Sequence, residues 1–591
     1  MPEPIEDYAV IGDRHTAALV SLRGSVDWLC LPRFDSPSCF SALLGDEEDG
    51  RWLLAPHDPD AVPTRRYRPG TSVLETTWTT STGEVVVTDA MPAGDDRADV
   101  VRRVVGVRGT VAMVHDWVVR PDYGRIRPWV TRHRDEDDQQ VISAVAGPDR
   151  LVLRGPRLPH PDRFHHRDEF EVRAGDDLTF VTTWSPSHHP VHPAQDVHAN
   201  IRASCADEQA WSDRAPTDVP QAALVARSLL TLRLLTHSRT GGIVAAPTTS
   251  LPEDFGGERN WDYRYCWLRD AALTLEALLA AGYADESRAW RDWLLRAVAG
   301  DPADLQIMYA VDGARRLPEV ELDHLAGYAD SRPVRVGNGA VSQRQTDVLG
   351  EVMIALQDAR AAGVHETPES WALQCALVGD LAEHWEEPDH GLWEIRGPEQ
   401  HFTHSRVMVW AAFDRAIRGV EDHGLDGPVE EWKRLREEVR ARILAENVDR
   451  EHGCFTQHSA TGDVDAALLT IPLVGFLPGD DPLVLGTIRA VEEDLMRDGL
   501  LLRYRTSSGV DGLSGDEHPF LACSFWLVSA YAAAGRHEDA RALFDRLCAL
   551  TNEVGLLSEE YDSEHERMAG NFPQAFSHLT LVLAALALRS D

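Results

Sequence analysis

Short segments that mix carboxylates with aromatic side chains stand out in this chain, because that mixture suits the binding and cleavage of a carbohydrate. Aromatic rings stack on the apolar C–H face of a sugar, while fixed Arg and Asp groups hydrogen-bond its hydroxyls. The densest segment runs from Arg259 to Asp270 and includes Tyr263, Trp267 and Arg269. Its alternative interpretation is a helix N-terminus in which Arg269 and Asp270 form an ordinary ion pair.

Two later segments each contain glutamates with the properties that acid/base catalysis needs. Glu394 follows Trp393 in a glycine-bounded loop, where desolvation would raise its pKa, as a general acid at neutral pH requires. Residues 557–562 contain Glu559, Glu560 and Asp562, which could supply a base. Taken singly, both segments also fit surface or helix-capping acids.

Three other polar segments have simpler structural interpretations. The loop 318–325 contains three acids and His324, an acid/base candidate that also fits a loop wall with satisfied polar groups. The histidines of residues 188–192 lie in a Pro-rich polar stretch without a neighbouring set of Cys or acid ligands, which favours a solvated loop over a metal site. Gly337 and Gly339 favour a turn over a phosphate loop, because no GxGxxG motif follows a strand there.

Composition disfavours several classes of function. The 591 residues carry a formal net charge of −38, which argues against nucleic acid and membrane partners, since both need Lys/Arg patches. The single lysine, Lys433, argues against Schiff-base and Walker-type chemistry. The eight cysteines form no CxxC pair and are interpreted as small core residues in a reducing compartment. We see no signal peptide and no apolar run that could span a bilayer, so we expect a cytoplasmic protein.

The elements that must position the candidate residues change type near residue 200. Residues 76–80 and 85–88 predict two strands joined by a turn, and residues 100–119, 151–153 and 178–184 predict further strands. Such short strands indicate an antiparallel β-sandwich over residues 1–205. From Pro220 onward, helical periodicity predicts about twelve helices. Their expected starts lie near Gln221, Trp267, Ser287, Gln343, Pro368, Phe402, Val429, Val464, Pro482, Phe520, Glu538 and Gln574.

Twelve paired helices suit a double ring of six inner and six outer helices over residues 236–591, with residues 206–235 as a linker and first helix. A helical solenoid is the alternative, but it should show internal repeats, and none is evident. The segment Asp301–Ser342 shows no convincing helix, and a compact domain keeps so long a loop mainly for function.

Taken together, these segments resemble glycoside hydrolase family 15, the glucoamylase family, and most of all its bacterial trehalase-like branch. Residues 16–20 and 24–36 look like the opening domain of that branch, and residues 265–270 resemble the family's aromatic–Arg–Asp motif. Residues 327–338 and 571–578 also match the branch, whereas residues 515–520 depart from the expected form, which puts the pocket rim in doubt. The resemblance implies an N-terminal β-sandwich, a C-terminal (α/α)6 barrel, and inverting hydrolysis of an α-glucosidic bond at the non-reducing glucose, without a cofactor or metal.

The resemblance also implies roles for single residues. It makes Glu394 the general acid and Glu559 the general base, with Glu560 as the next candidate for the base. Inversion requires the two carboxyl groups to lie roughly 6.5–9.5 Å apart, so that a water fits between them and the sugar. Positioning of the water is implied for Tyr263, and contact with the sugar for Trp267, Arg269, Asp270, Trp393 and Arg503.

The identity of the leaving group stays open at this point. The trehalase-like N-terminus favours trehalose, whereas a glucoamylase or glucodextranase would cut α-1,4 or α-1,6 glucans. A non-catalytic sugar-binding relative and a phosphorylase with the same pocket are the alternatives from other classes, and the presence of both glutamates argues against the first. A small carbohydrate is therefore the expected partner, and a homo-oligomer is compatible with the sequence.

Overall fold

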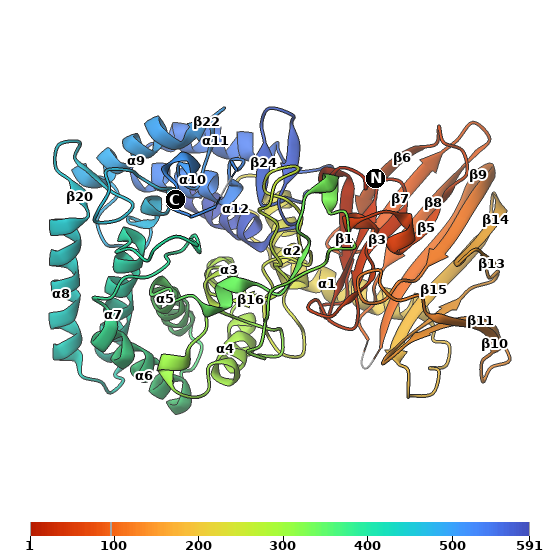
Figure 1. Cartoon of the computed structure of the whole chain (residues 1–591), viewed down its shortest axis with the longest axis horizontal. Helices are drawn as coiled ribbons and strands as arrows, with labels where there is room; N and C mark the ends of the chain where they lie inside the picture. The colour runs from red at the N-terminus through yellow and green to blue at the C-terminus, as the bar shows by residue number, and fades with distance from the viewer. Residues whose placement is uncertain (1, 95–96, 514, 590–591) are drawn as a thin grey trace.

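The computed structural model describes residues 2–94, 97–513 and 515–589, and it divides the chain into a β-sheet region followed by a helical region (Figure 1). The strands β1 to β15 lie between Tyr8 and Pro186, and the helices α1 to α12 lie between Val197 and Ala587. The predicted change of structure near residue 200 is confirmed.

The first region is an antiparallel sheet of fifteen strands among the described residues. The long strand β9 joins two sets of strands: its first half pairs with β8 and β15, and its second half pairs with β5 and β14. Contacts link the two sets, because the Tyr67 hydroxyl on β6 donates to the Val10 carbonyl on β1 across 2.6 Å. The strands are β1 (Tyr8–Gly12), β2 (Ala17–Ser21), β3 (Ser25–Cys30), β4 (Ser38–Phe40), β5 (Arg51–Pro56), β6 (Val62–Tyr67), β7 (Leu74–Thr79), β8 (Gly83–Ala90), β9 (Ala98–Val118), β10 (Trp129–Arg134), β11 (Gln140–Ala146), β12 (Asp149–Arg154), β13 (His160–Asp162), β14 (His165–Arg173) and β15 (Asp177–Pro186).

The strand β7 illustrates why these residues form a sheet. Leu74, Thr76 and Trp78 are buried, whereas Glu75 and Thr77 between them are partly exposed. This alternation is the period of two that a strand imposes on its side chains. The strands expected at 76–80, 85–88, 100–119, 151–153 and 178–184 correspond to β7, β8, β9, β12 and β15.

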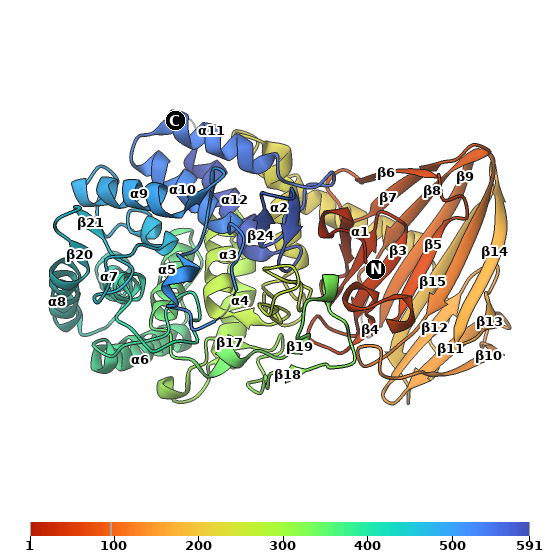
Figure 2. The same cartoon turned by 45° about the horizontal axis from the view of Figure 1, so that its top comes forward.

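The helical region contains a ring of inner helices with mostly buried side chains. Around this ring α12 packs on α3, α3 on α5, and α5 on α7, while α10 packs on α12; the 3-10 helix Ala466–Thr470 contacts both α7 and α10 and completes the circuit (Figure 2). The helices are α1 (Val197–Ser212), α2 (Ala222–Leu234), α3 (Leu268–Ala280), α4 (Asp285–Ala297), α5 (Asp347–Ala361), α6 (Pro368–His384), α7 (Thr403–His423), α8 (Val429–Glu446), α9 (Pro482–Leu495), α10 (Leu521–Ala533), α11 (His537–Cys548) and α12 (Ala575–Ala587).

One expected α-helix is wrong, and one α-helix was not expected. The helix expected near Val464 is the 3-10 helix Ala466–Thr470, because Pro472 lacks the N–H group that would extend it as an α-helix. The helix α1 was not expected, and its first nine residues fall inside the range predicted as β-sandwich. The helix α1 is polar over most of its surface, so its sequence shows little apolar periodicity. It buries Val197 and Ile201 against apolar side chains of the sheet, such as Val101. The segment Asp301–Ser342 has only 3-10 turns and two-residue strands, as expected.

The sheet region also supports the loop that precedes α3. Trp28 donates its indole N–H to the Pro247 carbonyl across 2.8 Å. Arg264 donates to the Ser36 carbonyl and to the Tyr123 hydroxyl, each at 2.9 Å. These contacts fix the chain before and within the aromatic-rich segment, so the first region helps to position the candidate site.

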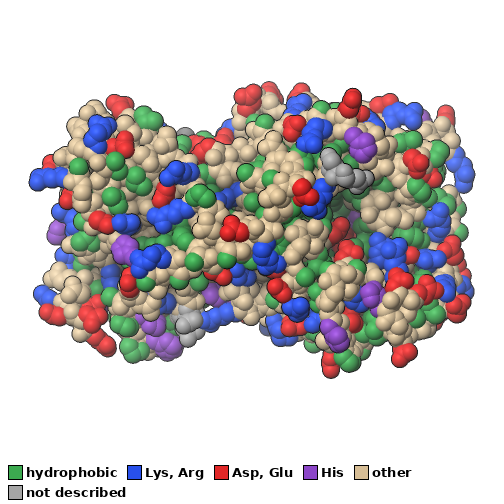
Figure 3. Space-filling model, turned by 180° about the vertical axis from the view of Figure 1, so that it is seen from behind, with side chains coloured by type: hydrophobic (Ala, Val, Ile, Leu, Met, Phe, Trp, Pro, Cys, Tyr) green, Lys and Arg blue, Asp and Glu red, His purple; other side chains and the backbone are tan. Residues whose placement is uncertain are grey.

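Surface and thiol features agree with the bulk composition. On the face seen in Figure 3, acidic and basic side chains are interspersed, without a continuous basic stripe. All eight cysteines are free, and six of them are buried, as small core residues would be. In the described part of the chain, no helix combines the length and apolar character that crossing a bilayer needs.

Candidate active site

All eight residues predicted for the site line one cavity, with about 730 Å³ of empty space including its open mouth. The cavity lies at the N-terminal ends of α3, α10 and α12, because Trp267, Phe520 and Gln574 are the residues that precede these helices. The lining residues are Ala245, Glu253, Arg259, Trp261, Tyr263, Trp267, Arg269, Asp270, Asn338, Ala340, Leu392, Trp393, Glu394, Arg396, Arg503, Tyr504, Leu513, Phe520, Glu559, Gln574 and Phe576.

Glu394 lies in the loop between α6 and α7, and its backbone has the unusual left-handed conformation, with φ of 57°. Such a conformation costs free energy in a residue other than glycine and tends to occur at functional sites. Gln343 holds this part of the loop by donating its amide to the carbonyls of Glu394 and Ile395, each at 3.0 Å. The indole N–H of Trp267 donates to Oε1 of Glu394 across 2.6 Å. The carboxyl group is therefore oriented by its neighbours.

Glu559 lies just before the short strand Glu560–Asp562 and is 1 % exposed. The Tyr263 hydroxyl donates to its Oε1 across 2.7 Å, and the backbone N–H of Asn571 donates to Oε2 at 3.4 Å. Gly570 packs directly on this side chain: a Cβ atom there would lie 2.6 Å from Oε2, and its φ of 74° also favours glycine. The glycine thus makes room for the carboxyl group.

Burial raises the pKa of both carboxyl groups. For Glu394, desolvation is the largest cause, the charge of Arg269 lowers the pKa, and that of Asp270 raises it. For Glu559, desolvation again leads, followed by the negative charge of Glu253, and together they raise the pKa to about 8 against the lowering by Arg503. Because both values move in the same direction, the pKa values alone do not distinguish an acid from a base.

Arg269 links the first turn of α3 to the loop that carries Glu394. Its Nε donates to Asp270 at 3.0 Å, one Nη donates to the Leu392 carbonyl at 2.7 Å, and the other approaches Oε1 of Glu394 at 3.4 Å. The ion pair between Arg269 and Asp270 therefore exists, but it faces the cavity rather than the surface. Trp393 is oriented by a hydrogen bond of 3.0 Å to Asp465.

Arg503 contacts three carboxylates, which fix it in the cavity wall. Its Nη2 lies 2.8 Å from Glu253, 2.6 Å from Glu517 and 3.3 Å from Glu560. Glu517 belongs to the segment that departs from the resemblance, and it lies behind Arg503 rather than at the rim. Glu560 is fully buried and does not line the cavity, so of the two adjacent glutamates only Glu559 faces it.

Several residues that line the cavity were not predicted from the sequence. Arg259 and Trp261 belong to the aromatic-rich segment, so the sequence pointed to their segment but not to these two residues. Trp261 is flanked by the guanidinium groups of Arg335 and Arg396, which lie 4.5 and 4.3 Å from its ring centroid. Glu253 had no distinguishing signal, because it follows a proline in a loop and resembles a surface acid.

The other predicted candidates lie elsewhere. Glu319 in the loop 318–325 accepts from the Gly339 N–H at 2.9 Å and from Arg396, and the other polar residues of that loop are exposed. No residue of that loop lines the cavity, which favours the structural interpretation of the loop over an acid/base role. Among the described residues, the histidines of residues 188–192 belong to no group of three or more side chains that could hold a metal ion.

Two buried clusters do combine acids or imidazoles closely enough to bind a metal ion. In the first, Glu253, Glu517 and Glu560 surround the guanidinium group of Arg503, which already supplies a positive charge. The second consists of Asp347, Glu351 and His404, and none of these three lines the cavity.

Comparisons with known proteins agree over nearly the whole chain. The model of glycosyl hydrolases family 15 matches residues 219–586, and a trehalase-like N-terminal model matches residues 1–163. A trehalase of Mycobacterium tuberculosis is 38% identical, over 99% of this chain and 89% of the relative. A trehalase of Thermoplasma volcanium is 32% identical, over 98% of this chain and 93% of the relative. A bacterial glucoamylase complexed with acarbose has the same fold, with a TM-score of 0.72 at 12% identity, covering 99% of this chain and 95% of that chain.

Proposed function

The chain belongs to glycosyl hydrolases family 15, and on this premise we propose that it is a trehalase, which hydrolyses α,α-trehalose to glucose. The chain is thus a glycoside hydrolase. The assignment of trehalose as the substrate rests on the similarity of the chain to trehalases along almost all of its length, including the N-terminal region. We assign the finer architecture as a β-sandwich over residues 1–205, apart from the first nine residues of α1, a linker and first helix over 206–235, and an (α/α)6 barrel over 236–591. The circuit of packed helices supports the barrel.

The proposed reaction uses the two buried glutamates in opposite protonation states. Glu394 donates a proton to the glycosidic oxygen as the bond to the terminal glucose breaks. Glu559 accepts a proton from a water that attacks the anomeric carbon from the opposite face, which inverts the configuration. Both side chains line one cavity, as this scheme requires.

Tyr263 and Arg503 favour the ionised form of Glu559, which is the form that a general base needs. The Tyr263 hydroxyl fixes one carboxylate oxygen and stabilises the ionised form, and the charge of Arg503 acts in the same direction. Once ionised, Glu559 and the nearby Asp270 stabilise the positive charge that develops on the sugar ring in the transition state.

Arg269 and Asp270 are the proposed ligands for hydroxyl groups of the terminal glucose. Fixed by each other and by the Leu392 carbonyl, they offer donors and acceptors without needing to rearrange. Trp267 and Trp393 supply flat apolar surfaces for the C–H faces of the sugar.

Purified enzyme incubated separately with trehalose, maltose, isomaltose and dextran tests the proposal, with NMR following the anomer of the released glucose. Trehalose should be cleaved with equal amounts of α- and β-glucose appearing first, because inversion of one α-linked residue releases β-glucose and the leaving glucose keeps its α configuration. Preferential cleavage of maltose or isomaltose would reassign the enzyme as a glucoamylase or glucodextranase. Initial release of α-glucose alone would overturn the inverting mechanism.

The glutamate variants test the assigned residues. Glu394→Gln and Glu559→Gln keep the shape of each side chain and remove its proton transfer, and each should reduce kcat at least about 100-fold. Full activity in either variant would remove that residue from the mechanism.

A further inference from the structure

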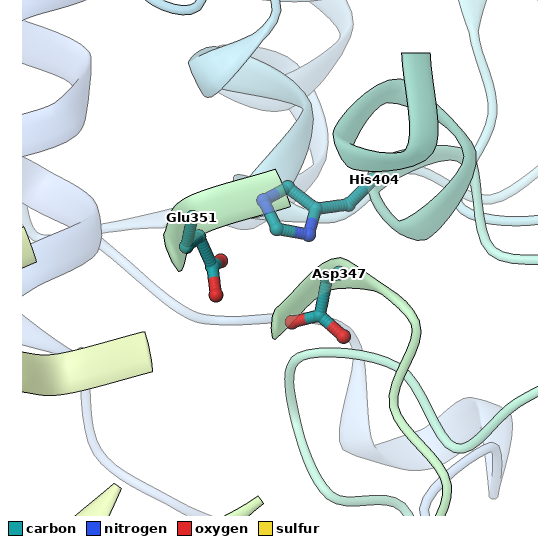
Figure 4. Close-up of side chains that lie close together, drawn as sticks. All are labelled: Asp347, Glu351 and His404. Carbon is teal, nitrogen blue, oxygen red and sulfur yellow. The ribbon is translucent and has the colours of Figure 1, made fainter. Parts of the chain in front are cut away.

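A buried cluster of Asp347, Glu351 and His404 lies outside the candidate active site and has unmet polar groups. The three residues are 0 %, 3 % and 4 % exposed. Both carboxylate oxygens of Asp347, Oε2 of Glu351 and Nδ1 of His404 are buried without a hydrogen-bond partner among the described residues. Figure 4 shows the two carboxylates and the imidazole around one common space. A buried polar group without a partner costs free energy of folding, so a ligand bound in this space would stabilise the protein.

The sequence places these three side chains together through two packed helices. Asp347 and Glu351 are four residues apart on α5 and therefore lie on one face, one turn apart. His404 is in the first turn of α7, which packs against α5. Gly350 permits the close approach of the helices, since a Cβ atom there would lie 2.4 Å from the Met408 carbonyl oxygen of α7.

Among the described residues, no basic side chain forms an ion pair with either carboxylate. The charge of Arg269 acts on both, but the hydrogen bonds of its guanidinium group go to Asp270, the Leu392 carbonyl and Glu394. Two adjacent buried carboxylates without a direct counter-charge repel each other and lose their hydration. A cation bound between them would remove both costs.

We propose that Asp347, Glu351 and His404 bind one divalent cation of the Mn²⁺ or Zn²⁺ type, which joins α5 to α7. Their ligand atoms lie within 4.8 Å of one another. Ligand atoms on opposite sides of an ion at about 2.1 Å lie roughly 4.2 Å apart, so a small closure of the side chains would complete the site. Two carboxylates and one imidazole form a mixed oxygen and nitrogen set, which suits such ions better than the all-oxygen sets of Ca²⁺ or Mg²⁺.

A second cavity provides a route to this site. It has about 1140 Å³ of empty space including its open mouth, and Glu351 and His404 line it together with side chains nearer the C-terminal ends of the inner helices, such as Ala587. The rings of Trp526 and Phe576, one lining each cavity, contact each other with centroids 5.3 Å apart between the two spaces. An ion would therefore reach the cluster without passing the substrate, and it would stabilise the structure rather than take part in the reaction.

Mn²⁺ binding to the full chain, measured after removal of metals with a chelator, tests the proposal. Electron paramagnetic resonance counts the bound Mn²⁺, and electron spin-echo modulation detects coupling to an imidazole ¹⁴N nucleus. The experiment is done at about 0.3 M KCl, because the strongly acidic surface would otherwise attract Mn²⁺ loosely. We expect one tightly bound Mn²⁺ per chain, coupling to ¹⁴N, competition by Zn²⁺, and a higher melting temperature with the ion.

Two variants locate the site. Glu351→Gln keeps the side-chain shape and removes one anionic ligand, so Mn²⁺ affinity should fall at least about 100-fold. Asp358→Asn, in the wall of the same cavity but outside the cluster, should bind as the wild type does. Absence of stoichiometric Mn²⁺ and Zn²⁺ binding in the wild type, binding without ¹⁴N coupling, or unchanged affinity in Glu351→Gln would each overturn the proposal and leave shared protons or water as the content of the cluster. A Glu351→Gln chain that failed to fold would not block the test, because the wild-type stoichiometry and ¹⁴N coupling can overturn the proposal without the variant.

Discussion

The Tyr263 hydroxyl donates a hydrogen bond of 2.7 Å to Oε1 of Glu559, although 296 positions separate the two residues in the sequence. This bond favours the ionised carboxylate, which is the form that a general base needs, whereas burial and the charge of Glu253 oppose ionisation. The proposed base is therefore balanced between opposing effects, and single substitutions should shift its pKa in either direction.

Tyr263→Phe removes the donor and keeps the aromatic ring. We expect kcat to fall about tenfold and the acidic limb of the kcat/KM profile to move to higher pH, because Glu559 loses an interaction that lowers its pKa. Initial rates on trehalose across pH measure both effects. Tyr504→Phe is the matched control, since Tyr504 also lines the cavity but donates to Asp511, at 3.1 Å. An acidic limb that stays in place in Tyr263→Phe contradicts the role given to this bond.

Glu253→Gln should move the acidic limb in the opposite direction. The negative charge of Glu253 is the second-largest cause of the raised pKa of Glu559, so its removal should lower that pKa. More Glu559 is then ionised at a given acidic pH, and kcat/KM should persist to lower pH. The exposed Glu321 provides the control Glu321→Gln, which should leave the profile unchanged. A shift to higher pH would show that Glu253 acts mainly through Arg503.

Glu559→Gln and Glu560→Gln separate two adjacent glutamates. The first should lose at least about 100-fold in kcat, because no other carboxyl group replaces its proton transfer. In the second variant kcat should fall at most about tenfold, since Glu560 does not line the cavity and contacts the site through Arg503. Circular dichroism checks that both variants fold. If Glu560→Gln proves the more damaging substitution, the base has been assigned to the wrong residue.

Arg264→Met should destabilise the protein by about 3–5 kcal/mol, because it leaves the buried carboxylate of Asp262 without its partner. The substitution also removes the hydrogen bonds from Arg264 to Ser36 and Tyr123 in the sheet region. Urea denaturation followed by tryptophan fluorescence measures the change. Arg288→Met breaks an exposed ion pair with Asp285 and should change stability by no more than about 0.5 kcal/mol. Equal effects of the two variants would show that the Arg264 contacts contribute little to the free energy of unfolding.

The sequence alone determined the order of the elements and the chemical types at the site. Alternating side chains in segments such as Leu74–Thr79 predicted strands, and 3.6-residue periodicity predicted most of the helices, because both patterns are local consequences of backbone geometry. Local pattern failed where distant contacts decide: the polar helix α1 depends on the sheet to bury Val197 and Ile201.

Tertiary structure alone decided which glutamate faces the cavity and what surrounds it. Glu559 and Glu560 are neighbours with the same chemistry. The path of the backbone into the short strand 560–562 places the side chain of Glu559 in the cavity and that of Glu560 against Arg503. Glu253, Glu517 and Arg503 come from three separate segments, so their mutual charges, and hence the pKa of Glu559, have no signature in any one of them. Electrostatic interactions depend on distances in space, and folding sets those distances between residues that lie hundreds of positions apart.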